Sequence, residues 1–81
     1  MVKSWKKFIN KSPIKNELNK IINDISSNNL EWYYIRKLEW YNNLYRIRKW
    51  KIRIIFEKWE GDNYIVAVDT RWQVYRWLKT Y

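Results

Sequence analysis

The hydrophobic positions in the first third of the chain recur with helical spacing. Trp5, Phe8 and Ile9 predict a short first helix, and Ser12 followed by Pro13 marks a second helix, as N-cap and first helical residue. The second helix carries an apolar stripe at positions i, i+4, i+7, i+8 and i+11, which are Ile14, Leu18, Ile21, Ile22 and Ile25. We expect this stripe to pack on a core and the loop-forming residues 26–29 to end the helix.

From Asn43 onward the period changes to two, and the residue types become β-branched and aromatic. This pattern predicts three strands, at residues 44–49, 52–57 and 64–68. The last two strands are separated by a turn that contains Glu60, Gly61 and Asp62. Residues 44–68 therefore predict an antiparallel meander.

The last residues return to helical spacing, because Val74, Leu78 and Tyr81 fall at i, i+4 and i+7. The expected fold class is α+β: two N-terminal helices packed on a small antiparallel β-meander, followed by a short C-terminal helix. Eighty-one residues are close to the lower limit for a domain that folds alone, so we expect one domain over residues 1–81.

The first hairpin has a register that can be derived from its turn. If Trp50 and Lys51 are the two central turn residues, position 49 pairs with 52 and position 48 with 53. One side of the hairpin then carries Tyr45, Ile47, Ile54 and Phe56, an apolar face for the helices. The other side carries Arg46, Arg48, Arg53 and Ile55.

This register predicts an arginine directly opposite another arginine, Arg48 facing Arg53. Like charges across a sheet are destabilising, so stability alone would seldom select such a pair. A bridging phosphate would account for it, because the guanidinium fork donates two hydrogen bonds to an oxyanion and stays charged at any working pH. The competing interpretation is a solvated basic surface.

The charge of the chain agrees with a polyanionic partner. Seventeen Lys and Arg residues against eight Asp and Glu residues give a formal net charge of +9. The excess is concentrated between residues 33 and 53, where the only acid is Glu39. The basic residues of this segment are Arg36, Lys37, Arg46, Arg48, Lys49, Lys51 and Arg53.

The residue types that are missing also narrow the chemistry. The chain has no cysteine and no histidine, so we expect no disulfide, no thiolate or imidazole catalysis and no metal site of the usual ligand types. No stretch reaches the roughly 18 apolar residues of a membrane span, and residues 1–10 lack a signal-peptide core. We therefore expect a cytoplasmic protein without cofactor.

Arg71 and Tyr75 form a second constellation. In a helical terminal segment they lie at i and i+4 on one face, beside the apolar stripe, and could reach the edge of the sheet. The alternative is a surface arginine next to a half-buried tyrosine.

The region from Arg36 to Tyr75 resembles the RelE/ParE superfamily of bacterial toxins. The family pattern has a Lys-Leu-x-Gly segment, Tyr-Arg-Ile-Arg, a glycine turn, Arg-Ile-Ile-Tyr/Phe and a terminal Arg-x-x-Val-Tyr. Here the matching segments are residues 37–40, 45–48, 53–56 and 71–75. The resemblance covers about half the chain, and the two preceding helices sit where the family has them. The family's first strand is expected to be short or missing, since residues 1–4 leave little room for it.

The resemblance implies a function and roles for individual residues. The RelE-like branch cuts messenger RNA on the ribosome. Arg46 and Arg48 match a basic pair that binds the scissile region, Arg53 and Arg71 match arginines that stabilise the phosphorane-like transition state, and Tyr75 matches a tyrosine in proton transfer or stacking. Further RNA-binding residues are expected among the neighbouring cations Arg36, Lys37, Lys49, Lys51 and Arg76.

The resemblance also implies partners and rival functions. The expected partners are a cognate antitoxin protein, the ribosome and mRNA. One alternative is a ParE-like inhibitor of DNA gyrase, which shares the fold without being a nuclease. The other alternative is an inactive basic module that binds nucleic acid.

Tryptophan and glycine are unusually distributed, with seven Trp and one Gly. Trp40, Trp50 and Trp72 stand where the family pattern has glycine, and a two-residue turn of type II′ prefers glycine at position 50. Either the tryptophans form a stacking platform for bases, or a stop-type codon has been read as Trp where the source organism inserts Gly. We favour the second explanation, because a stacking platform would not use turn positions.

Overall fold

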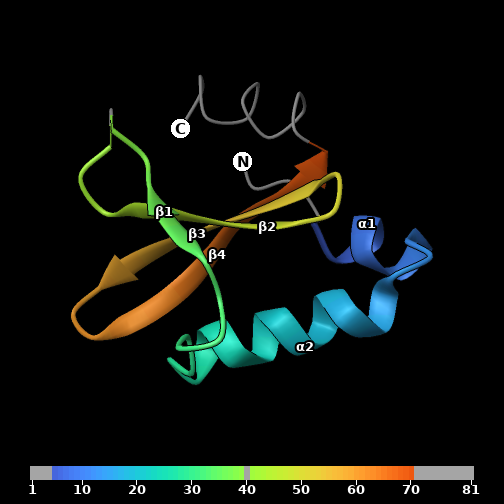
Figure 1. Cartoon of the computed structure of the whole chain (residues 1–81), viewed down its shortest axis with the longest axis horizontal. Coiled ribbons are helices and arrows are strands. Elements are labelled where there is room, and N and C mark those ends of the chain that lie inside the picture. The colour runs from blue at the N-terminus through green and yellow to red at the C-terminus, as the bar shows by residue number, and fades with distance from the viewer. Residues whose placement is uncertain (1–4, 40, 71–81) are drawn as a thin grey trace.

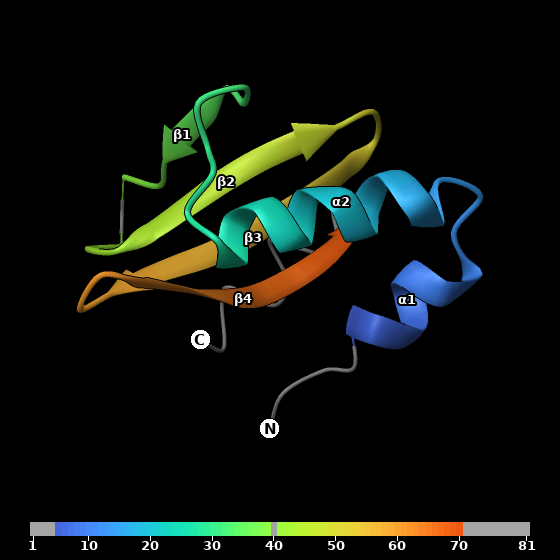
Figure 2. The ribbon, with the colours of Figure 1, turned by 90° about the horizontal axis from the view of Figure 1, so that it is seen from below.

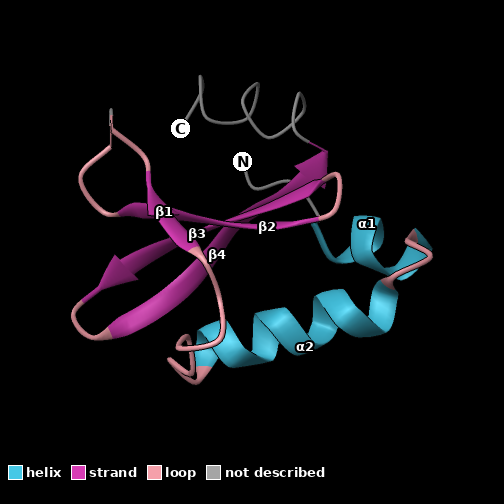
Figure 3. Cartoon of the chain, viewed as in Figure 1, coloured by secondary structure: helices cyan, strands magenta, loops and turns pink. Residues whose placement is uncertain are grey.

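A computed structural model of the chain describes residues 5–39 and 41–70, and within them two helices precede a sheet (Figures 1 and 3). The elements are α1 (Trp5–Lys11), α2 (Lys15–Ser26), β1 (Ile35–Lys37), β2 (Leu44–Lys49), β3 (Ile52–Trp59) and β4 (Asp62–Thr70). The four strands form one antiparallel sheet in the order β1-β2-β3-β4. The α+β class and the meander are therefore confirmed, whereas the C-terminal helix predicted from residues 74–81 lies outside the described residues.

Both N-terminal helices are confirmed, but the predicted start of α2 is wrong. The helix begins at Lys15 and has Ile14 as its N-cap, without a capping side chain. Pro13 instead lies in a turn, in which the Lys15 N–H donates to the Ser12 carbonyl at 3.2 Å. The Ser12 hydroxyl accepts a hydrogen bond from the Ile14 N–H, also at 3.2 Å. Ser12 therefore satisfies the turn and is not the cap of the helix.

The end of α2 falls where the loop-forming residues predicted it. Asn28 adopts a left-handed conformation with φ of 58°, and its N–H donates to the Ile25 carbonyl. The Asn29 N–H donates to the Asp24 carbonyl at 2.7 Å, which completes the hydrogen-bond pattern of a Schellman motif. The side chain of Asn63 donates to the Ile25 carbonyl at 2.9 Å, so the start of β4 is attached to this helix end.

The strands reproduce the predicted meander and extend it. The bounds of β2 agree with the prediction, whereas β3 and β4 continue beyond residues 57 and 68. The strand β1, which follows the two helices, was not predicted, because three residues are too few to display an alternating pattern. A short strand at this edge is consequential, since it brings Arg36 and Lys37 into the sheet.

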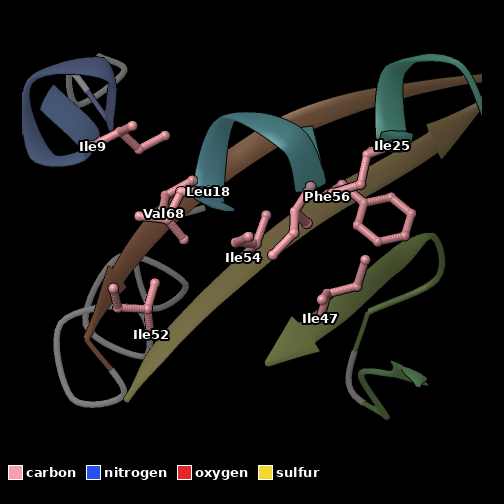
Figure 4. Close-up of a cluster of buried hydrophobic side chains, with 9 residues drawn as sticks. Ile9, Leu18, Ile25, Ile47, Ile52, Ile54, Phe56 and Val68 are labelled. Atoms are coloured by element: carbon pink, nitrogen blue, oxygen red, sulfur yellow. The ribbon is translucent and has the colours of Figure 1, made fainter. Parts of the chain in front are cut away.

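The two helices lie on the same face of the sheet, as the view in Figure 2 shows. Between helices and sheet lies the main core, part of which is drawn in Figure 4. Its buried members are Ile9, Leu18, Ile21, Ile25, Ile47, Ile52, Ile54, Phe56 and Val68. Complete burial of a large aliphatic or aromatic side chain contributes about 1.5–3 kcal/mol, so this layer is a major source of the stability of the fold.

Candidate nucleic-acid interface

The β2–β3 hairpin has the register that its turn predicted. Lys49 pairs with Ile52, Arg48 with Arg53, and Arg46 with Ile55. Residues directly opposite in an antiparallel pair project to the same face, and alternate residues of a strand share a face. The apolar partners Ile47 and Ile54 belong to the core under the helices. Arg46, Arg48 and Arg53 are therefore all placed on the face that α1 and α2 leave uncovered.

The strand that was not predicted adds a fourth arginine to this face. Arg36 of β1 is directly opposite Arg46 of β2. The sheet consequently carries two like-charged cross-strand pairs, Arg36 with Arg46 and Arg48 with Arg53. We refer to Arg36, Arg46, Arg48 and Arg53 as the arginine face. Like charges directly opposite each other are destabilising unless neighbouring groups compensate them.

The four arginines differ in their access to solvent. Arg36 and Arg48 are exposed, and Arg46 is half-buried. Arg53 is only 7% exposed, and its cross-strand partner Asp69 is 4% exposed. Buried charges require nearby compensation, and the register pairs Arg53 with an acidic residue on the neighbouring strand. Arg36 and Arg48 are thus accessible to solvent, Arg46 is partly accessible, and Arg53 is not.

The arginine face also has an apolar part. A small second cluster is formed by buried Leu44, Ile55 and Ala67, with Leu38, Tyr41 and Val66 packed against it. Leu44 and Ile55 lie on the same face of β2 and β3 as the arginines. Five consecutive residues of β3, from Ile52 to Phe56, are buried. Ile52, Ile54 and Phe56 belong to the main core, and Ile55 belongs to the small cluster. β3 is therefore buried on both faces over this stretch, and Arg53 is buried with it.

Two of the lysines expected to bind RNA lie on the other face of the sheet. Lys37 is opposite Tyr45, and Lys49 is opposite Ile52, which places both with the helix-packed residues. Lys49 borders an open groove of about 370 Å³ between α2 and β2. The groove is lined by Glu17, Lys20, Ile21, Trp32, Tyr33, Ile47, Arg48 and Lys49. The sheet therefore separates the central cations into two groups that the sequence alone presents as one cluster.

The turn between β2 and β3 holds the seventh basic residue of this region, Lys51. Lys51 is exposed, and its ammonium lies 5.5 Å from the ring centroid of Trp50. Trp50 has a φ of 58°, in the left-handed region that favours glycine. The structure thus confirms that position 50 makes a conformational demand typical of glycine, although tryptophan occupies it. The other predicted site residues, Arg71, Tyr75 and Arg76, lie outside the described residues.

One group of titratable side chains escaped the sequence analysis. The Tyr33 hydroxyl donates a hydrogen bond to Asp24, and the Lys20 ammonium lies 3.0 Å from the same carboxylate oxygen. The Tyr33 hydroxyl, followed by Lys20, holds the pKa of Asp24 below its ordinary range. Burial, followed by the hydrogen bond to Asp24, raises the pKa of Tyr33, and the same carboxylate raises the pKa of Lys20. This group joins α2 to the loop before β1.

Within residues 5–39 and 41–70, no three His, Cys, Asp or Glu side chains are grouped so that they could hold a metal ion. No helix in these ranges is long and apolar enough to cross a membrane.

The described chain thus defines an α+β protein with two helices on one face of an antiparallel sheet and arginines on the other face. A chain in the crystal structure of the RelB-RelE antitoxin-toxin complex from Methanococcus jannaschii is similar, with a TM-score of 0.74 and 25% sequence identity. The similarity covers 94% of this chain and 94% of that chain. Neither a protein-family model nor a curated protein matches the sequence. The fold is therefore shared with a component of a toxin-antitoxin complex.

Proposed function

We propose that the chain is the toxin of a type II toxin-antitoxin system and acts as a ribosome-dependent mRNA endoribonuclease. The observation that carries this proposal is the arginine face, with its two like-charged cross-strand pairs. A net charge of +9 and the Tyr-Arg-Ile-Arg segment at residues 45–48 favour the RelE component over the RelB component. The similarity to a chain of an antitoxin-toxin complex supports an antitoxin partner as well.

The proposed chemistry is attack of a ribose 2′-hydroxyl on the neighbouring phosphate. Negative charge develops on the phosphate oxygens in the transition state, and preorganised cations stabilise it. Arg48 is exposed and Arg46 half-buried on the same strand face, so these two guanidinium groups are suited to contact the scissile phosphate. Arg71 and Tyr75 are assigned by resemblance to transition-state stabilisation and proton transfer.

The burial of Arg53 assigns it a different part in the proposal. A guanidinium that is 7% exposed and opposite Asp69 has little surface to offer a ligand. We assign Arg53 to the support of Arg48, its cross-strand neighbour, through the local positive potential. The charge of Arg53 then still favours a phosphate at Arg48 although another side chain makes the contact.

The burial of Arg53 is also compatible with a second function. Because one of the three predicted catalytic arginines of the hairpin is withdrawn from the surface, the arginine face also fits a toxin that does not cut RNA. The candidate of this kind is a ParE-like inhibitor of DNA gyrase. Its distinguishing result is trapped gyrase on DNA with intact mRNA.

A reconstituted translation reaction distinguishes the two functions. Primer extension on the translated mRNA should reveal cuts at ribosomal A-site codons. The variant Arg48→Gln should lower the rate of cutting by about 100-fold, the magnitude typical of removing one donor to a developing oxyanion. Lys15→Gln, which removes an exposed charge at the start of α2, should cut like the unmodified chain.

The outcome that rules out the nuclease is equally specific. Uncut mRNA together with gyrase-dependent DNA breaks would replace the proposal with the gyrase function. If the mRNA is uncut and gyrase is not inhibited, the remaining function of the arginine face is binding of nucleic acid without catalysis.

A further inference from the structure

Tyr34 is an exposed aromatic residue immediately before β1, and the proposed cleavage chemistry does not use it. Its side chain is 83% exposed. Single exposed aromatic residues are common on protein surfaces and need no function by themselves. Tyr34 differs from such residues in two respects, which are its position beside Arg48 and the anchoring of the chain on both sides of it.

The residues on either side of Tyr34 determine the face of the sheet to which it projects. Tyr33 and Ile35 both pack against the main core, on the side of the sheet that the helices cover. Successive side chains of an extended chain point to opposite faces. Tyr34 therefore projects to the other side, the face on which Arg36 lies.

The register of the sheet places Tyr34 beside Arg48. Ile35, the first residue of β1, is paired with Ile47 of β2. Because the two strands are antiparallel, one step back from Ile35 is level with one step forward from Ile47, which is position 48. The groove between α2 and β2 agrees with this placement, since Tyr33 and Arg48 both line it. Tyr34 and Arg48 are thus neighbours across the edge of the sheet.

The chain is anchored on both sides of Tyr34. The Tyr33 N–H donates to the Leu30 carbonyl at 3.1 Å, and the Tyr33 hydroxyl donates to Asp24 of α2. On the other side, Ile35 is held by its pairing in the sheet. An exposed ring on an anchored backbone loses little conformational freedom when a ligand binds. Such a residue is suited to a flat ligand that contacts one face of the ring.

We propose that Tyr34 is a base-stacking residue, whose ring contacts the base of the nucleotide that has its phosphate at Arg48. The inference rests on the proposed function only in placing a phosphate at Arg48. A nucleotide combines a flat base with an anionic phosphate, and an aromatic ring beside a guanidinium matches both parts. Stacking tolerates any base, because every base has a π face. Tyr34 then adds affinity for the base, whereas Arg48 supplies affinity for the phosphate.

The test compares two ligands that share a phosphate and differ in the base, adenosine 5′-monophosphate and ribose 5-phosphate. Dissociation constants are measured by NMR titration of the whole chain at low salt. The base should tighten binding by about tenfold in the unmodified chain, as expected for stacking on one aromatic ring. Tyr34→Ala should abolish this gain, and Tyr34→Phe should retain it. The adenine H2 and H8 resonances should move upfield on binding, because they then lie over an aromatic ring.

Tyr64 provides a matched control for Tyr34. It is also an exposed tyrosine, but it lies on β4 opposite Glu57, and β3 separates it from β2. Tyr64→Ala should therefore retain the gain from the base. Because Tyr34 is largely exposed, Tyr34→Ala should have the Tm of the unmodified chain, which shows that a lost gain is not caused by unfolding.

Three results would overturn the inference: equal binding of the two ligands to the unmodified chain, a gain that persists in Tyr34→Ala, or a gain that Tyr34→Phe loses. Persistence in Tyr34→Ala would leave Tyr34 as a contact for the antitoxin. Arg48→Gln should weaken the binding of both ligands, and unchanged affinities would contradict the phosphate contact of the proposed function. Cleavage of mRNA plays no part in this comparison, so a failed nuclease assay does not affect the stacking site.

Discussion

Single residues on the arginine face owe their different properties to their neighbours across the strands. Arg48 and Arg53 are cross-strand partners with the same charge, but Arg48 lies on the exposed strand end and Arg53 is buried opposite Asp69. In the proposed function, a phosphate contacts the Arg48 guanidinium and experiences Arg53 mainly through its charge. Residue type alone does not separate these roles, since both are arginines in the same hairpin.

The side chains of Tyr33, Asp24 and Lys20 lead to a prediction on acid stability. Asp24 has a lowered pKa in the folded chain, so its ionised form contributes stability above the unfolded pKa of about 4. This contribution is lost as the pH falls through the lower, folded pKa. Because the Tyr33 hydroxyl is the main cause, Tyr33→Phe should reduce the Tm at neutral pH and have a smaller effect in acid.

Circular dichroism melts between neutral and strongly acidic pH measure this difference. Asp24→Asn is the control, since it removes the titrating carboxylate and should also lose the acid dependence. The Tm difference between Tyr33→Phe and the unmodified chain should therefore depend on pH. A difference that is constant from neutral to acidic pH would contradict the role of Tyr33 in lowering the pKa of Asp24.

At the scale of elements, the two-residue turn between β2 and β3 determines the composition of the arginine face. A slip of one residue in this hairpin would move Arg46 and Arg48 to the helix side. The turn holds the register although Trp50 adopts a φ of 58°. A left-handed conformation costs a residue with a Cβ atom about 1–2 kcal/mol. The hairpin therefore forms in spite of its first turn residue.

The substitution Trp50→Gly should accordingly stabilise the fold by about 1 kcal/mol, because glycine adopts a positive φ without steric cost. Chemical denaturation monitored by circular dichroism measures the change. Lys51→Gly is the matched control at the neighbouring turn position, which has no positive φ, and it should not stabilise. A lower stability of Trp50→Gly would show that the tryptophan ring contributes more than the strain costs.

The same position bears on the two explanations for the tryptophans. A ring that is 63% exposed at a glycine-type turn position gives no packing reason for tryptophan. The structure thus agrees with an inserted glycine at position 50. The intact mass of the protein from its native host decides between the explanations, because seven tryptophans would exclude the recoding.

Short-range patterns were sufficient for part of the fold and of the candidate site. The stripe of α2 and the alternation of β2 and β3 are long enough to reveal their period, and the turn at Trp50 then fixes the register of three arginines. The short strand β1 gives no such signal, so the pairing of Arg36 with Arg46 was not predictable. The start of α2 was misplaced because a Ser-Pro pair can form a turn as well as a cap.

The burial of Arg53 could not be predicted from the sequence pattern either. Alternation predicts to which face Arg53 points but not that Asp69 of β4 lies opposite it. That pairing depends on the irregular register at Ile55 and Phe56, which shifts the two strands relative to each other. The separation of Lys37 and Lys49 from the arginines follows from the register once β1 is known.

At the scale of the whole molecule, the central property is that the two faces of one sheet carry different residues. The helices lie on one face of the sheet (Figure 2), together with the main core. The arginines and the small apolar cluster lie on the other face. A net charge of +9 would attract RNA to any part of the surface. A binding site on the arginine face requires that RNA affinity depends on where the charges lie and not only on the total charge.

Salt dependence of RNA binding tests this requirement most directly. Two variants are compared, Arg36→Gln with Arg48→Gln on the sheet and Lys7→Gln with Lys15→Gln on the helices. All four residues are exposed, and each double variant has a net charge of +7, two less than +9. The slope of log affinity against log salt changes by about 0.7 for each phosphate contact with a single strand. We predict that the sheet variant loses about 1.4 from the slope and the helix variant almost nothing. Equal slopes for the two variants would contradict the account, because RNA would then respond to the total charge and not to the arginine face.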